Sequence, residues 1–146
     1  MGRVSASIEL PHPPERVFRV ATRIEDLPRW LPEVVEAELL DPELTQGSHV
    51  RLRMSPTVAG IEILGTVRQV RAPSVLAIGG TGGPLTIEVR TRLVPVGASS
   101  TRIALEVDLS AAPLLGFVAR EAERRINAEL PASLERFRSL LDAEPD

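Results

Sequence analysis

The last long segment of the chain, from Pro113 to about Leu141, constrains the fold more than any other. Its apolar residues recur at spacings of four and three, which places them along one side of an α-helix, and charged residues fill the other side. The apolar series is Leu114, Val118, Ala122, Ile126, Leu130, Leu134, Phe137 and Leu141. This apolar stripe must be buried against another part of the chain, and the strands predicted before it can provide the apolar face that it packs against. Pro131 lies inside the segment, where we expect a kink.

Seven earlier segments, beginning with Val4–Leu10, alternate apolar and polar side chains as half-buried strands do. We predict a seven-stranded antiparallel sheet whose strands follow one another along the chain. Its dry face is expected to include Val50, Leu52, Ile61, Ile63, Leu85, Ile87, Val89, Ile103, Leu105 and Val107. The alternation changes phase between Arg68 and Val70, which indicates a β-bulge. Gly79–Pro84 is expected to be a flexible loop at the rim of the fold.

Two short helices are expected between the first and second strands. Pro14 followed by Glu15 marks the start of the first helix, and Asp26 is a suitable N-cap for the second. Pro32 ends that second helix, because a residue before proline disfavours the helical conformation. The second strand is then expected to direct three residues inward, namely Val35, Ala37 and Leu39.

Composition excludes several function classes. The 146 residues are expected to form one domain, 1–146, with a net charge of -3. The arginines are interspersed with acidic residues, so no basic stripe indicates nucleic acid binding. The first ten residues lack the apolar region of a signal peptide, and no apolar run is long enough to span a membrane, so we expect a cytoplasmic protein. The absence of Cys, Lys and Tyr removes thiol, Schiff-base and phenol chemistry.

Titratable groups suited to catalysis are scarce in the pattern. His12 lies in a proline-rich turn and His49 on the wet face of a strand, and no Asp or Glu stands at a spacing that would orient either. Alternation places the polar residues Thr91 and Gln69 inward. Each either contacts a ligand or is a core residue whose polar group forms its hydrogen bonds with the backbone. We therefore predict no catalytic residue, no metal site and no cofactor.

The opening of the chain resembles a known family. Residues 13–18, Pro-Pro-Glu-Arg-Val-Phe, and residues 25–32, Glu-Asp-Leu-Pro-Arg-Trp-Leu-Pro, are similar to the pattern P-x-x-x-V-[FW] … D-x-x-x-[WY]-x-P of the START-like, polyketide cyclase-like superfamily (SRPBCC). The resemblance implies an α+β helix-grip fold, in which a curved seven-stranded antiparallel sheet wraps around a long C-terminal helix. A weaker similarity, over residues 56–65 and 79–83, is to the G-type subunit of carbon monoxide dehydrogenase.

We expect the chain to bind or transport a small apolar ligand, lipid-like, polycyclic or quinone-like, in a cavity between sheet and helix, and not to be an enzyme. The expected ligand-binding residues are Trp30, Met54, Ile63, Ile87, Val89, Thr91, Phe117, Val118, Ala122 and Ile126. Trp30, Met54 and Phe117 have a second interpretation as ordinary core residues. The alternatives are a polyketide cyclase or dehydratase, or a ligand-free accessory subunit of an oxidoreductase. A protein partner or a homodimer is left open.

Overall fold

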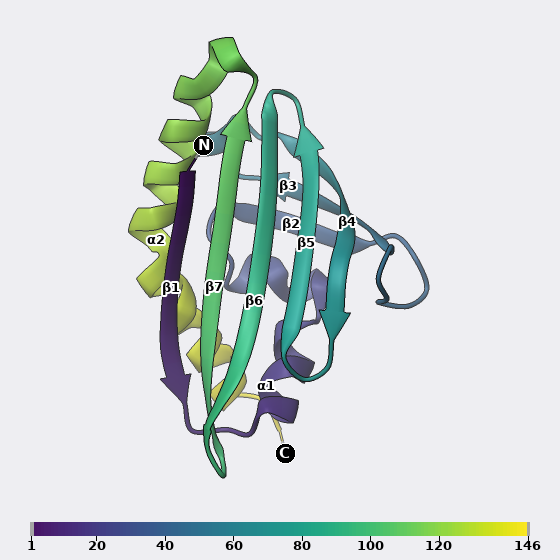
Figure 1. Cartoon of the computed structure of the whole chain (residues 1–146), viewed down its shortest axis with the longest axis vertical. Coiled ribbons are helices and arrows are strands. Elements are labelled where there is room, and N and C mark those ends of the chain that lie inside the picture. The colour runs from purple at the N-terminus through teal and green to yellow at the C-terminus, as the bar shows by residue number, and fades with distance from the viewer. Residues whose placement is uncertain (1, 146) are drawn as a thin grey trace.

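A computed structural model describes residues 2–145 of the chain. The elements are, in order, β1 (Gly2–Leu10), α1 (Pro14–Ala21), the 3-10 helix η1 (Ile24–Arg29), β2 (Val34–Leu39), β3 (His49–Met54), the 3-10 helix η2 (Pro56–Val58), β4 (Glu62–Arg71), β5 (Val75–Gly82), β6 (Leu85–Gly97), β7 (Ser100–Ala111), the 3-10 helix η3 (Pro113–Leu115) and α2 (Gly116–Asp142). The predicted α+β architecture is confirmed: a curved antiparallel sheet wraps around one long helix (Figure 1).

The sheet has the order β1-β7-β6-β5-β4-β3-β2, so each strand pairs with its neighbour in sequence except β1, which pairs with β7. Figure 1 shows α2 running along the edge formed by β1 and β7, and then crossing behind the sheet towards α1. At the other edge of the sheet, η1 packs against β2. Edge strands that are covered do not pair with other chains.

The dry face of the sheet is confirmed for most of its predicted residues. Eight are buried, namely Val50, Leu52, Ile63, Leu85, Ile87, Ile103, Leu105 and Val107, and two are half-buried, namely Ile61 and Val89. The predicted bulge is present, because the pairing of β4 with β5 shifts between Val67 and Gln69. On the wet face, Arg92 Nε lies 3.7 Å from Glu106 Oε1 on the neighbouring strand, as the charge pattern indicates.

Three predictions about the strands and short helices are wrong. Val35 is exposed, because a register shift between Val34 and Glu36 turns Val34 inward in its place. The second short helix begins at Ile24, before Asp26, and Asp26 lies within it. Gly79–Gly82 is the end of β5 and not a loop, and the turn is confined to Gly83 and Pro84.

The glycines of β5 have a packing function. A Cβ on Gly80 would lie 2.4 Å from the carbonyl oxygen of Leu64, and a Cβ on Gly82 would lie 2.0 Å from that of Glu62. Gly80 is opposite Gly65 on β4, so the two strands approach each other at a point where neither carries a side chain. The glycine run is therefore a requirement of strand packing, which the sequence pattern does not distinguish from a mobile loop.

The helix α2 begins later than predicted and is unbroken through Pro131. Its buried residues are Ala119, Ala122, Ile126, Leu130, Ser133, Leu134, Phe137 and Leu141. Leu114 precedes the helix, in η3, and is 93% exposed. The predicted apolar stripe is therefore correct from Ala122 onward. Nearer the start of the helix, the buried residue is Ala119 and not the predicted Val118 or Leu114.

Candidate functional site

An internal cavity lies where the middle of the sheet faces α2. Nine residues line it, all of them apolar: Leu31, Pro32, Val34, Leu52, Met54, Ile87, Val89, Val107 and Ile126. They come from β2, β3, β6, β7, α2 and the segment that joins η1 to β2. The volume of about 20 Å³ has room for roughly one water molecule. A cavity with an apolar lining offers that water no hydrogen bond, so we expect it to be dry.

The predicted ligand-binding residues fall into three groups relative to this cavity. Four of them line it, namely Met54, Ile87, Val89 and Ile126. Four are buried in the core outside its lining, namely Trp30, Ile63, Thr91 and Ala122. Val118 is half-buried, and Phe117 is 60% exposed. Five of the nine lining residues were not among those predicted, and a ligand-binding role of the ten predicted residues stays a prediction.

The interpretation of Phe117 as an ordinary core residue is wrong, because its side chain is exposed, and helical geometry gives the reason. The buried face of α2 is centred on Ala119, Ala122 and Ile126. At about 100° per residue, Phe117 lies roughly 160° around the helix from Ala119. The expected stripe was extended backwards in steps of four from Ala122 to Val118 and Leu114, although the regular helix begins only at Gly116.

The segment between η1 and β2 is fastened to α2. The backbone carbonyl oxygen of Trp30 accepts hydrogen bonds from the Ser133 hydroxyl and from Arg136 Nη2, the latter at 3.3 Å. The Trp30 ring packs against Phe137 with 4.7 Å between ring centroids. The indole Nε1 of Trp30 is buried and has no hydrogen-bond partner. Trp30 is thus the fixed point from which Leu31, Pro32 and Val34 reach the cavity.

A pair of carboxyl groups, Glu33 and Glu129, lies beside this segment. Glu33 stands between the cavity-lining residues Pro32 and Val34, and Glu129 is one turn along α2 from Ile126. Burial raises the pKa of Glu129, and the negative charge of Glu33 and a hydrogen bond with it act in the same direction. Arg136 and Arg125 oppose the rise. The two carboxyl groups can therefore share one proton, although neither belongs to the lining of the cavity.

The conformation of Glu33 is unusual. Its φ is 63°, in the left-handed region that residues other than glycine seldom adopt. The Thr57 hydroxyl donates a hydrogen bond to Glu33 Oε1, and the Ser55 amide donates to the Glu33 carbonyl oxygen at 2.9 Å. Contacts from η2 and α2 therefore hold a backbone geometry that the residue does not favour by itself.

Sequence reasoning missed this carboxyl pair. Glu33 and Glu129 lie in distant parts of the chain, and neither belongs to the alternating pattern of a strand. The available signal was indirect: Glu33 follows the motif residues Trp30 and Pro32, and Glu129 flanks the helical stripe. No spacing rule connects the two positions, so only the fold brings them together.

The expectation that no carboxylate orients a histidine is also wrong. His12 Nε2 lies 2.9 Å from Asp142 Oδ1 at the end of α2, and His49 Nδ1 lies 3.1 Å from Asp41 Oδ2 across a loop. Both pairs are on the surface, away from the lining of the cavity. They tie chain segments together, as surface ion pairs do with small effects on stability.

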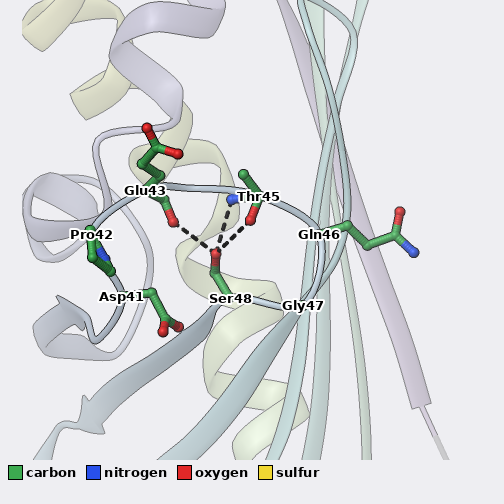
Figure 2. A pocket seen from close by; sticks show the side chains of 7 residues that line it. All are labelled: Asp41, Pro42, Glu43, Thr45, Gln46, Gly47 and Ser48. Carbon is green, nitrogen blue, oxygen red and sulfur yellow. Dashed lines mark hydrogen bonds between the residues drawn. The ribbon is translucent and has the colours of Figure 1, made fainter.

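The loop that carries Asp41 encloses a second hollow, of about 470 Å³, lined by residues 41–48 except Leu44 (Figure 2). Its polar groups satisfy one another. Ser48 Oγ donates to the Glu43 carbonyl oxygen at 2.8 Å and accepts from the Thr45 amide at 2.9 Å. The hollow is the inside of a self-bonded surface loop, so the internal cavity is the better candidate site.

Residues 2–145 lack the features of two other kinds of site. No helix in this part of the chain is long and apolar enough to cross a membrane. In the same residues, no group of three or more His, Asp or Glu side chains is arranged to hold a metal ion.

Comparison with known proteins identifies the family. Residues 1–142 match the family described as polyketide cyclase / dehydrase and lipid transport, and the chain belongs to this family. The predicted resemblance to START-like and polyketide cyclase-like proteins is thereby confirmed. The further similarity to the G-type subunit of carbon monoxide dehydrogenase is not confirmed by the comparisons. Among curated proteins, no sequence matches the chain.

Several solved structures share the fold. A protein from Thermus thermophilus is 21% identical, with a TM-score of 0.78 over 97% of this chain and 98% of its own. The Zhui aromatase/cyclase from a Streptomyces species is 18% identical, with a TM-score of 0.76 over 97% and 93% of the two chains. A START superfamily protein from Mycobacterium smegmatis is 17% identical, with a TM-score of 0.67 over 96% and 97%.

These findings correct the expectation that the chain is not an enzyme. The family description names cyclases and dehydrases beside lipid transport, and one of the similar structures is an aromatase/cyclase. The expectation relied on the absence of an acid or base on the dry face of the sheet. It did not consider Glu33 and Glu129, which lie outside the strands and close in sequence to the lining residues Pro32, Val34 and Ile126.

Proposed function

We propose that the chain binds a small apolar molecule, lipid-like, polycyclic or quinone-like, between the sheet and α2. The single observation that carries the proposal is the lining of the internal cavity, which is apolar at all nine positions. A surface of this kind binds by removing apolar area from water, at roughly 25 cal/mol per Å². The lipid transport named in the family description agrees with such a guest.

A guest larger than one water molecule requires the cavity to expand from its present volume of about 20 Å³. Two features make expansion feasible. Met54 is a flexible, unbranched side chain that adapts to guests of irregular shape. The segment that contributes Leu31 and Pro32 is neither helix nor strand, so its displacement breaks few backbone hydrogen bonds.

The test is a titration with N-phenyl-1-naphthylamine, an uncharged dye that fluoresces in apolar surroundings. We expect saturable binding with one dye per chain. A Val107→Trp variant should lose it, because the larger side chain fills the cavity, whereas Val94→Trp, on the exposed face of β6, should bind as the parent does. Unsaturable fluorescence, or equal binding by both variants, would refute the proposal.

A cyclase- or dehydratase-type reaction on the bound molecule is the second candidate function. The Glu33–Glu129 pair favours it, because the raised pKa of Glu129 favours its protonated form, which can act as proton donor while Glu33 acts as acceptor. In the elimination of water, the acceptor takes the proton from carbon, the carbon–oxygen bond breaks, and the donor supplies the proton that lets hydroxide leave as water. The pair holds one proton before and after the reaction.

This second candidate is tested with a β-hydroxy ketone whose dehydration gives a conjugated, ultraviolet-absorbing enone. The protein should accelerate the reaction, and Glu33→Gln and Glu129→Gln should each abolish the acceleration. A rate equal to that of buffer would exclude this chemistry for the substrate tested, and acceleration retained in both variants would exclude the pair as its source.

A further inference from the structure

One part of the cavity wall differs from the rest. Six of the nine lining residues belong to β3, β6, β7 and α2, which are long elements with many hydrogen bonds. Leu31 and Pro32 belong to a short connection, and Val34, the first residue of β2, follows it. The connection starts at Trp30, which is anchored to Ser133, and ends where the register shift separates Val34 from the remaining pairs of β2 with β3. A bulge of this kind lets a strand bend locally.

The middle of this connection is held by contacts that its own backbone does not favour. Glu33 keeps a left-handed φ of 63° while its side chain accepts a hydrogen bond from Thr57 and faces Glu129 on α2. A strained residue persists only when its surroundings hold it. Once the contact with Glu129 is removed, Glu33 is held only from the other side, by Thr57 and by the Ser55 amide. Glu33, with Pro32 and Val34 beside it, can then relax away from the helix.

We propose that residues 31–34 form a gate over the internal cavity, and that the contact of Glu33 with Glu129 is the latch that keeps the gate closed. The inference rests on the proposed binding of an apolar guest, because a cavity of about 20 Å³ is too small to admit one. A gate of this kind would let a guest reach a cavity that is too narrow to admit it while residues 31–34 stay in place. The latch serves entry of the guest whether or not a reaction follows.

The latch responds to pH, and the surrounding charges give the sign. Glu129 faces Glu33 of the connection and Arg125 and Arg136 of its own helix, while the neutral Thr57 contacts Glu33 from η2. Arg125 Nε also lies 3.3 Å from Glu121 Oε1, and Arg136 also binds the Trp30 carbonyl oxygen. Both arginines favour the charged form of Glu129, but burial and Glu33 outweigh them, so the pKa of Glu129 is raised.

With one proton between them, Glu129 and Glu33 attract each other; with none, they repel. In the open gate the pKa of Glu129 returns towards its ordinary value of 4.5, whereas in the closed gate it is raised. The open fraction therefore increases as pH rises above about 4.5 and levels off above the raised pKa. Between the two pKa values the increase is up to about tenfold per pH unit for one proton.

The absence of cysteine from the chain provides a direct test. Val34→Cys introduces one thiol inside the cavity, and Val35→Cys introduces one on the exposed neighbour as a matched control. Labelling by methyl methanethiosulfonate, an uncharged reagent, measures access to each thiol. The rate for Val34→Cys divided by that for Val35→Cys corrects for the effect of pH on thiol chemistry itself.

We expect this ratio to rise with pH in the chain with native Glu129. Adding Glu129→Gln should hold the ratio at its low-pH value throughout, because the amide donates permanently to the Glu33 carboxylate. Adding Glu129→Ala should hold it high throughout, and Glu123→Gln, on the same helix, should follow the native profile. A flat native profile, or an unchanged profile in the Glu129→Gln background, would overturn the gate.

Two further measurements separate failure of the gate from failure of the proposed function. Hydrogen exchange of the Ser55 amide, which is bonded to the Glu33 carbonyl oxygen, should be faster at pH 8 in the native chain than in Glu129→Gln at the same pH. This comparison needs no ligand and stands if Val34→Cys fails to fold. If exchange and labelling show the gate but N-phenyl-1-naphthylamine never binds, the binding proposal fails. If the dye binds with an entry rate independent of pH, the latch fails.

Discussion

The buried hydroxyl of Ser133 on α2 donates a hydrogen bond to the backbone carbonyl oxygen of Trp30. This bond joins the C-terminal helix to the end of η1, two parts of the chain that the sequence pattern treats as independent. It also sets the point from which the cavity-lining connection begins. The position of this connection therefore depends on how it is held against α2.

Replacing Ser133 by alanine should lower the free energy of unfolding by about 1–2 kcal/mol, because a buried hydrogen bond is lost and Arg136 alone remains at the carbonyl oxygen. Urea unfolding followed by the fluorescence of Trp30, the only tryptophan, measures this directly. Ser139→Ala, on the less buried side of the same helix, should change stability by less than about 0.5 kcal/mol. Equal effects of the two substitutions would show that the Ser133 bond contributes nothing.

Gly80→Ala should destabilise the fold by about 3 kcal/mol or more, because the added methyl group meets backbone atoms of β4 that no side-chain rotation can move. Gly97→Ala is the control, since its Cβ would lie 3.8 Å from Ser100 Cβ, an ordinary contact. Thermal unfolding of the two variants should differ by many degrees. Similar melting temperatures would mean that β4 and β5 do not approach as closely as described.

Ile126→Ala should destabilise the protein by about 2–5 kcal/mol and enlarge the cavity. Leu130→Ala, one turn further along α2 and equally buried, should cost a similar amount without touching the cavity lining. Only Ile126→Ala should then bind N-phenyl-1-naphthylamine more tightly than the parent does. A gain in affinity in both variants would indicate binding to loosened core and not to this cavity.

Stability should depend on pH through Glu129. Its folded-state pKa is raised above the ordinary 4.5, chiefly by burial. The protonated form therefore adds to the free energy of unfolding in full below about pH 4.5, and this addition is lost as pH rises through the raised pKa. Glu129→Gln should remove that loss. Comparing urea midpoints of parent and variant from pH 4 to 8 should show a difference that grows with pH in favour of the variant. A constant difference would contradict the assignment.

Much of the fold follows from the sequence because strand alternation and the helical stripe are local patterns. Val50, Leu52 and Met54 alternate with charged residues and are buried as expected, and the phase change after Arg68 correctly indicates the bulge. Errors occur where a local pattern has two physical meanings. A glycine run is typical of a mobile loop, yet Gly80 and Gly82 lie in a strand, at positions where the backbone of β4 leaves no room for a Cβ.

The candidate site was less predictable for a related reason. Periodicity correctly selected Ile87, Val89 and Ile126 as inward residues, but it could not tell the cavity lining from the packed core around it. Glu33 and Glu129 have no spacing in common and become partners only through the crossing of a connection over α2. Long-range pairs of this kind follow from tertiary structure and not from composition or period.

The central claim is that an apolar guest occupies the space between the sheet and α2. The most direct test is a titration of protein labelled with ¹³C at isoleucine methyl groups, followed by nuclear magnetic resonance as N-phenyl-1-naphthylamine is added. Ile87 and Ile126 line the cavity, and their signals should shift together and saturate, while those of Ile8 and Ile24, outside the lining, should stay in place. Saturable dye binding that leaves Ile87 and Ile126 unchanged would contradict the account.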